Sequence, residues 1–284
     1  MELGIVDTYK MLFKMIMLPL MPATIAVLLT SKVGFSVADA VTGLKLIERG
    51  VPKNKLAMLA IPVIPLQIVL PWIISRYTNG PRPMDVFLKA MPPRLLMGLV
   101  YMWIVWATPS FQQMDGEFPL YYYLMIVGVY MVHQVFLYSM FVSIMAFFAR
   151  ISDPAVGGTY MTFLNTLTNL GGNWPATLAL WWVDVLTYKK CDLSSLVDFK
   201  SQNMTNTQID ELKTNICYSK EESNTCEKAG AKCVTEVEGY YVESVICVSL
   251  GFLWLGLWGW RTIKRLQSAS EEDWLVVAKT SKRR

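Results

Sequence analysis

Six long apolar runs leave this chain few ways to fold. They cover residues 11–30, 56–74, 91–107, 121–149, 159–186 and 240–260. A helix of about 20 apolar residues crosses a bilayer interior, and lipid admits only helices and closed barrels as spanning structures. Hydrophobic residues make up 54% of the 284 residues and charged residues only 17%, unlike the composition of a soluble domain. We therefore predict an all-α, polytopic membrane protein with six transmembrane helices.

The basic residues indicate how these helices are oriented. Lys and Arg are frequent in the connection 75–94 and in the tail 261–284, whereas the loop 108–120 carries only acidic charges. Because cytoplasmic loops are enriched in Lys and Arg, we predict that both termini are cytoplasmic. The segment 31–55 is then expected to be a loop on the opposite side, and its five basic residues do not fit that placement.

The long polar segment 188–239 is expected to be a lumenal loop. It contains a glycosylation sequon at Asn203 and four of the five cysteines. These are Cys191, Cys217, Cys226 and Cys233. Four cysteines in one polar loop favour two disulfide bonds in an oxidising compartment, with three possible pairings. A zinc site is the competing interpretation, but the spacings fit poorly and no histidine is near, so we predict no metal.

The fifth run carries a polar face. At about 100° per residue, its polar side chains fall in a sector about 100° wide. They are Thr162, Asn165, Thr166, Asn169 and Asn173. Polar groups are costly in hydrocarbon, so this face should border protein or water and form part of a pathway or pocket. The helix is interrupted by Gly171, Gly172 and Pro175 around Trp174, and broken helices are common where transporters bind substrate.

The fourth run contains the only histidine of the chain. His133 stands beside Gln134, with Tyr130 and Tyr138 about a turn away. An imidazole within a membrane is a candidate for proton transfer or phosphate recognition, and the simpler alternative is an interhelical hydrogen bond.

Basic residues are also expected around the cytoplasmic mouth. Those we consider for binding an anion are Lys14, Arg76, Arg94 and Arg150. Snorkelling and the positive-inside rule account for them equally well. The chain has no G-x-S-x-G, Walker A or H-E-x-x-H motif, so we predict no cofactor and no enzymatic activity. Its basic residues follow the topology, so we also expect no nucleic-acid partner.

Several long segments resemble one known family. The runs HQVFLYSMFVSIMAFFARISDP, GGTYMTFLNTLTNLGGNWPATLALWWVD and GYYVESVICV are similar to the acetyl-coenzyme A transporter family of the major facilitator superfamily. So are DAVTGLKLIERGVPK and PLQIVLPWIISRYTNGPRPM, and the resemblance extends over essentially the whole chain. It implies transport of acetyl-CoA from the cytosol into the lumen across the endoplasmic reticulum membrane. It also implies two six-helix halves, of which this chain resembles the C-terminal one.

A carrier of this polyanionic thioester needs cations, amides and aromatic rings. We expect the basic residues of the mouth to bind phosphates, the asparagines of the fifth run and Gln134 to bind pantetheine, and Tyr130 or Trp174 to stack on adenine. Two alternatives stay open. The chain is an acyl-CoA-dependent acyltransferase with His133 as its base, or it regulates a full-length carrier by pairing with it. Pairing with a second copy of itself is also open.

Overall fold

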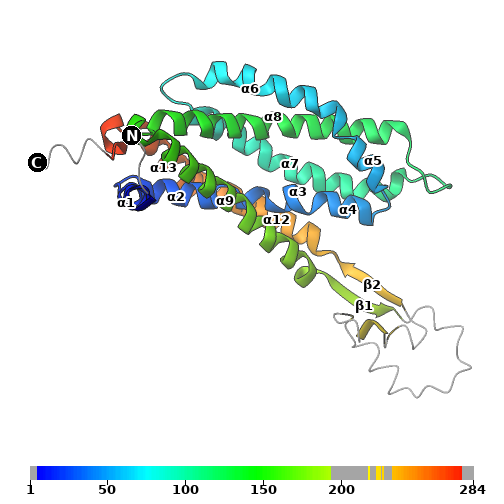
Figure 1. The fold of residues 1–284 in the computed structure, drawn as a ribbon. Helices are drawn as coiled ribbons and strands as arrows, with labels where there is room; N and C mark the ends of the chain where they lie inside the picture. Colours follow the sequence, from blue (N-terminus) through cyan, green and yellow to red (C-terminus); the bar gives the residue numbers. More distant parts are fainter. Residues whose placement is uncertain (1–4, 193–216, 218–221, 225, 227–231, 277–284) are drawn as a thin grey trace, which may run out of the picture.

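The computed structural model describes residues 5–192, 217, 222–224, 226 and 232–276. Within these ranges the chain is a bundle of long helices with one two-stranded hairpin at one end (Figure 1). The helices run back and forth along the bundle, and α1 (Ile5–Ile16) and α13 (Trp260–Ser268) lie at the end opposite the hairpin. The predicted all-α polytopic membrane fold is confirmed.

Five helical stretches among the described residues are long and apolar enough to cross a membrane. They are Met21–Glu48, Lys53–Thr78, Met84–Phe111, Leu120–Ile151 and Gly239–Ser268. The predicted runs 56–74, 91–107, 121–149 and 240–260 fall inside the last four of these stretches.

Each stretch is built from the following elements. The first contains α2 (Met21–Thr30), η1 (Val33–Phe35), α3 (Ser36–Ala40) and α4 (Thr42–Glu48). The second contains α5 (Lys53–Met58), η2 (Ile61–Val63) and α6 (Ile64–Thr78). The third is α7 (Met84–Phe111) and the fourth is α8 (Leu120–Ile151). The fifth contains α12 (Gly239–Trp254), the π-helical turn η5 (Leu255–Gly259) and α13 (Trp260–Ser268). The short turns η3 (Pro154–Val156) and η6 (Glu271–Trp274) lie outside these stretches.

The fifth predicted run forms α9 (Gly157–Leu186), which is as long as the others but is not among the five. Its amide and hydroxyl side chains lower its hydropathy, as expected for a helix with a polar face. Asp153 begins this region, and its side chain accepts a hydrogen bond from the Ala155 amide. The sixth crossing, by α9, therefore stays a prediction.

The first run differs most from its predicted bounds of 11–30. A separate helix, α1 (Ile5–Ile16), ends before Pro19, and a new helix begins at Met21. Proline donates no amide hydrogen bond, so a break is expected there. Helical structure then continues to Glu48, and the expected loop 31–55 is mostly helix. The sequence predicted a loop here because Lys32 and Asp39 are charged residues that follow the first apolar run.

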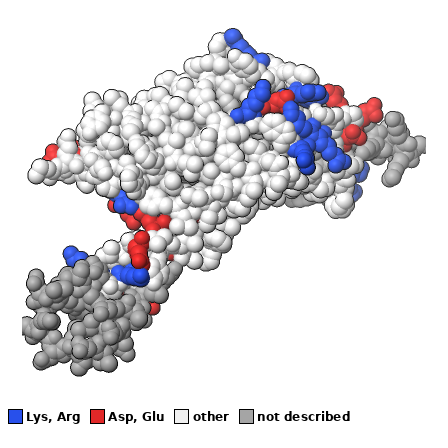
Figure 2. Space-filling view, turned by 180° about the vertical axis from the view of Figure 1, so that it is seen from behind, with Lys and Arg blue, Asp and Glu red and all other residues white. Residues whose placement is uncertain are grey.

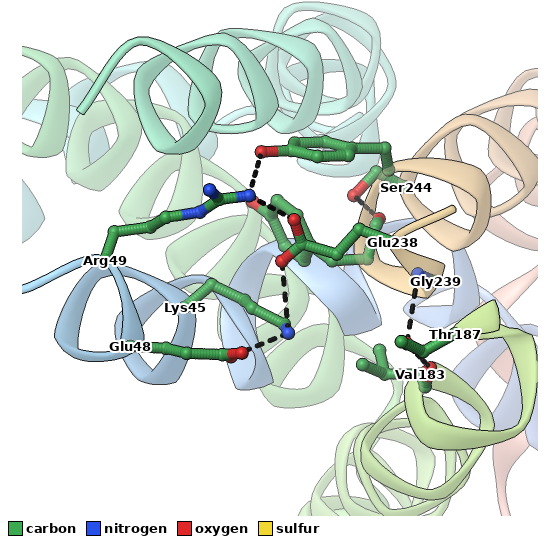
Figure 3. A network of polar contacts seen from close by, with 10 residues as sticks. Lys45, Glu48, Arg49, Val183, Thr187, Glu238, Gly239 and Ser244 are labelled. Carbon is green, nitrogen blue, oxygen red and sulfur yellow. Dashed lines mark hydrogen bonds and ion pairs between the residues drawn. The ribbon is translucent and has the colours of Figure 1, made fainter. Parts of the chain in front are cut away.

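The basic residues at the end of this helix have acidic partners (Figure 3). Lys45 Nζ lies 3.1 Å from Glu238 Oε1, and the Arg49 guanidinium also donates to Glu238. Beside them, the Gly239 amide donates to Thr187 Oγ1 at 3.1 Å. These bonds tie the ends of α4, α9 and α12 together and account for two of the five basic residues that do not follow the orientation rule.

The hairpin consists of β1 (Tyr188–Asp192) and β2 (Lys232–Val237), paired antiparallel with Cys191 opposite Cys233. The predicted disulfide bonds are present, and the pairing is Cys191–Cys226 and Cys217–Cys233. The sulfur atoms of these four cysteines are in disulfide bonds and are not the thiolates that bind zinc. Asn203 lies outside the described residues.

Charge is concentrated at the two ends of the bundle. Figure 2 shows Lys and Arg gathered at one end, a broad uncharged middle, and a smaller group of both signs near the hairpin. Comparison with Figure 1 places the basic group at the end where α1 and α13 lie. This is the pattern that the positive-inside rule anticipates.

Candidate functional site

The polar face of α9 looks outward from the bundle. Thr162, Asn169 and Asn173 are exposed, and Asn165 is half-buried. The hydroxyls of Thr162 and Thr166 each donate to the carbonyl four residues earlier, at 2.9 Å, so they are largely satisfied by their own helix. The asparagine amides are thus the groups that α9 offers to a ligand or to another chain.

A lysine from the neighbouring helix extends this face. Lys32 Nζ donates to the Thr168 carbonyl at 2.9 Å, and it lies beside the position that a side chain on Gly172 would occupy. The Trp174 indole donates to the Leu29 carbonyl at 2.9 Å, which fixes the ring against α2 while leaving it 37% exposed. We define the polar surface of α9 as Lys32, Asn165, Asn169, Asn173 and Trp174.

A second feature is a cavity of about 450 Å³ that opens to the surface of the bundle, where the lining residues Asp39, Gly43 and Ala60 are exposed. It lies between α3, α4, α5, α7 and α8, and its walls are mostly apolar. Its polar lining consists of Asp39, Thr42, Tyr101, Tyr130, His133 and Gln134. Its volume is within the range of about 300–1,000 Å³ that is common for small-molecule sites.

Three ionisable side chains meet at the wall of this cavity. Arg94 Nη2 lies 2.7 Å from Asp39 Oδ2, and His133 Nε2 lies 3.4 Å from Asp39 Oδ1. Arg94 and His133 are buried, whereas 38% of the Asp39 side chain remains accessible because it lines the cavity. The Arg94 guanidinium also stacks over the Phe35 ring at 4.3 Å. The carboxylate and the guanidinium neutralise each other, which makes their burial tolerable.

The His133 ring is fixed by its neighbours, and one of its two nitrogens has no hydrogen-bond partner among the described residues. Its ring meets Tyr101 edge-on, with 5.3 Å between ring centroids, and lies roughly parallel to Tyr130 at 6.4 Å. Because Nε2 faces the Asp39 carboxylate, its proton is assigned there. Nδ1 is buried and has no hydrogen-bond partner among the described residues. A neutral imidazole in this tautomer presents an unused acceptor.

The structure brings some of the predicted residues together and separates others. His133, Gln134 and Tyr130 share the cavity, whereas Tyr138 packs edge-on against Phe141 and is not among the residues that line it. The predicted position of Arg94 at the cytoplasmic mouth is wrong, because its guanidinium is buried against Asp39 inside the bundle.

Of the other three basic candidates, two contact neighbouring residues and one is exposed. Lys14 is exposed on α1, Arg76 stacks on the Trp72 ring at 4.1 Å, and Arg150 donates to the Pro81 carbonyl. Arg76 and Arg150 have partners of their own that account for their positions.

Sequence reasoning missed Lys32, Asp39 and Tyr101. A signal was available for the first two. Val33, Val37 and Val41 recur at every fourth position, which is the spacing of one helix face. A helical interpretation of residues 31–48 would have placed a carboxylate inside the bundle and directed attention to a buried basic partner.

Comparison with known proteins identifies the family. A family model described as Acetyl-coenzyme A transporter 1 matches residues 2–276. The chain belongs to the acetyl-coenzyme A transporter family. The resemblance predicted from the sequence is thereby confirmed.

Two curated relatives from yeasts match nearly the whole chain. An uncharacterized protein of Schizosaccharomyces pombe is 27% identical over 276 residues, covering 97% of this chain and 49% of the relative. An uncharacterized membrane protein of Saccharomyces cerevisiae is 24% identical over 294 residues, covering 94% and 49%. The chain thus spans about half the length of the curated relatives it matches. No solved structure matches it significantly.

Proposed function

We propose that this chain is one six-helix half of a carrier that moves acetyl-CoA from the cytosol into the endoplasmic reticulum lumen. The observation that carries the proposal is the outward-facing polar surface of α9 in a member of the acetyl-coenzyme A transporter family. Amides and a lysine against acyl chains would be costly, so this surface needs a polar partner. A second half completes the pathway, and the substrate binds between the two halves.

The chemistry of the surface suits a CoA thioester. Asparagine amides both donate and accept, as the polar groups of the nucleotide part require. Lys32 supplies a cation for phosphate, and the exposed part of the Trp174 ring supplies a face for adenine. Arg76 and Arg150 lie nearer the basic end of the bundle, where a polyanion would first be attracted.

The proposed direction rests on two features of the ends. The basic end is assigned to the cytosol by the positive-inside rule. The hairpin end carries two disulfide bonds, which form in an oxidising compartment such as the endoplasmic reticulum lumen. Alternating access then occurs by rocking of this half against its partner half.

The test is uptake of labelled acetyl-CoA into vesicles that contain the chain together with its complementing half. Asn169→Leu removes an amide from the polar surface and should reduce uptake about tenfold or more, since a buried polar group of the substrate would lose its partner. Asn169→Gln keeps the amide and should retain most uptake. Leu178→Ala alters an exposed apolar side chain of the same helix and serves as the control. Wild-type uptake by Asn169→Leu at normal expression would remove the polar surface from the pathway.

Acyl transfer is the second candidate, because Asp39 orients His133 as it would orient a general base. Incubation of the purified protein with labelled acetyl-CoA distinguishes the carrier from the transferase. Label trapped in the vesicle lumen supports the carrier, and covalent label on an acceptor supports the transferase. Co-purification with a full-length carrier, without uptake or label transfer, supports a regulatory half.

A further inference from the structure

We propose that the open cavity beside His133 holds the acylated pantetheine arm of the thioester, while the nucleotide and its phosphates stay outside it. This inference takes the identity of the ligand from the proposed function. It adds which part of the ligand the cavity binds and which part the polar surface of α9 binds.

The hydrogen-bonding groups of the cavity match an amide-bearing chain. His133 Nδ1 is a buried acceptor without a partner among the residues that the structure describes, so it favours a ligand that brings an N–H group. The side chain of Gln134, which is 5% exposed, lines the same space and both donates and accepts. A pantetheine arm carries two amides, each with one N–H and one carbonyl, and can satisfy both residues.

The apolar walls match the rest of the arm. Leu46, Leu56, Leu59, Ile126 and Leu137 surround the polar groups. They suit the methylene links, the gem-dimethyl group and the acyl methyl, all of which gain from leaving water.

Among the described residues, the cavity offers a phosphate no free cation. Asp39 presents to it a carboxylate whose charge Arg94 already balances. Arg94 is engaged by that carboxylate and by the Phe35 ring, and it is not among the lining residues. Lys32 instead donates to a carbonyl of α9 on the polar surface. The phosphates therefore belong to the polar surface and the neutral arm to the cavity.

A substitution at Gly43 tests this assignment. It lines the cavity, and a Cβ added to it would meet no atom within 4 Å. Gly43 is exposed at the opening of the cavity, so Gly43→Leu adds bulk to the cavity lining without a clash at its first carbon. Gly128 is exposed on α8, outside the cavity, and also has open space at its Cβ position, so Gly128→Leu is the matched control.

The experiment measures displacement of labelled acetyl-CoA from the protein in nanodiscs by two probes. N-pentylpantothenamide carries the arm without phosphate or thiol, and adenosine 3′,5′-bisphosphate carries the phosphates without the arm. Gly43→Leu should weaken the pantothenamide by about tenfold or more and leave the bisphosphate unchanged. Gly128→Leu should change neither. Equal weakening of both probes, or no weakening of the pantothenamide, overturns the assignment.

A second variant keeps the test decisive if leucine disturbs folding. Gly43→Cys, in a Cys247→Ala background that removes the free thiol found among the described residues, should react with a small methanethiosulfonate reagent. The pantothenamide should protect this thiol and the bisphosphate should not. Protection by the bisphosphate, or none by the pantothenamide, overturns the assignment.

The same variants separate this inference from the proposed function. If wild-type vesicles take up acetyl-CoA but the cavity variants bind both probes normally, only the cavity assignment fails. If uptake is absent while Gly43→Leu still loses the pantothenamide selectively, transport fails and the binding site stands.

Discussion

Asp39 is a charged residue inside a helix that crosses the bundle, and its partners decide what it does there. Arg94 balances its charge, and His133 takes its orientation from it. Removing one member of such a buried pair leaves the other as an uncompensated charge, which costs far more than removing both.

We expect Arg94→Leu to reduce stability by about 3–5 kcal/mol, the range for a broken buried pair. Asp39→Asn in the same chain should restore part of that loss, because no unpaired carboxylate then remains. Thermal unfolding in detergent, followed by size-exclusion chromatography, measures both variants. The control is Lys190→Ala, which breaks the exposed Lys190–Glu236 pair of the hairpin and should change stability little. Equal loss in the single and double variants would contradict this account of the cluster.

At the scale of elements, the position of α9 depends on its close approach to α2. A Cβ on Gly171 would lie 2.0 Å from the Leu28 carbonyl oxygen, so only glycine allows the two backbones to meet. This approach also brings Lys32 and Trp174 into their hydrogen bonds across the junction. The polar surface of α9 is thus assembled by the crossing of two helices.

Gly171→Ala should push α2 and α9 apart and destabilise the protein by about 1–3 kcal/mol or more, as overpacking does. It should also reduce acetyl-CoA uptake, since Lys32 would move away from the asparagines. The adjacent Gly172→Ala is the control, because its Cβ would meet only the Lys32 side chain at 3.4 Å. A shift in unfolding temperature that is the same for both variants would argue against the close crossing.

For the whole molecule, the hairpin marks one end of the bundle chemically. Its two disulfide bonds join β1 and β2 to chain segments between them, and the ionic contacts of Glu238 attach its base to α4. The opposite end carries the basic residues together with α1 and α13. The two ends are therefore suited to different compartments.

The disulfide pairing predicts which thiol each cysteine variant exposes. Cys191→Ser should leave Cys226 open to alkylation under non-reducing conditions, and Cys217→Ser should leave Cys233 open. Peptide mapping by mass spectrometry after alkylation reads this directly. Alkylation of Cys233 in the Cys191→Ser variant would contradict the pairing.

The compartment of the hairpin can be tested through the sequon. If segment 188–239 is lumenal, Asn203 should carry a glycan that endoglycosidase H removes, and Asn203→Gln should show the same faster migration without treatment. Thr205→Val, which destroys the sequon while keeping the asparagine, should migrate like Asn203→Gln. A wild-type band that the enzyme leaves unchanged, and that migrates together with both variants, would contradict a glycosylated lumenal hairpin.

The sequence determined the features that depend on local composition. Helix length and hydropathy located α6, α7, α8 and α12, because a crossing needs only a long enough apolar run. Spacing alone also identified the polar face of α9, and composition indicated disulfide bonds in the long loop. These properties are set along one stretch of chain, whatever packs against it.

Only the tertiary structure decided what depends on a distant partner. Residues 31–48 appeared to be a loop because Lys32 and Asp39 are polar, but contacts with α9, Arg94 and His133 make those side chains acceptable inside the bundle. Arg94 likewise appeared to lie at the cytoplasmic mouth, because it is a charged residue of the basic connection 75–94. The cysteine pairing likewise depended on which segments meet in space. A buried charge or thiol is stabilised by groups far away in the chain, and no local pattern records which of them will be its neighbour.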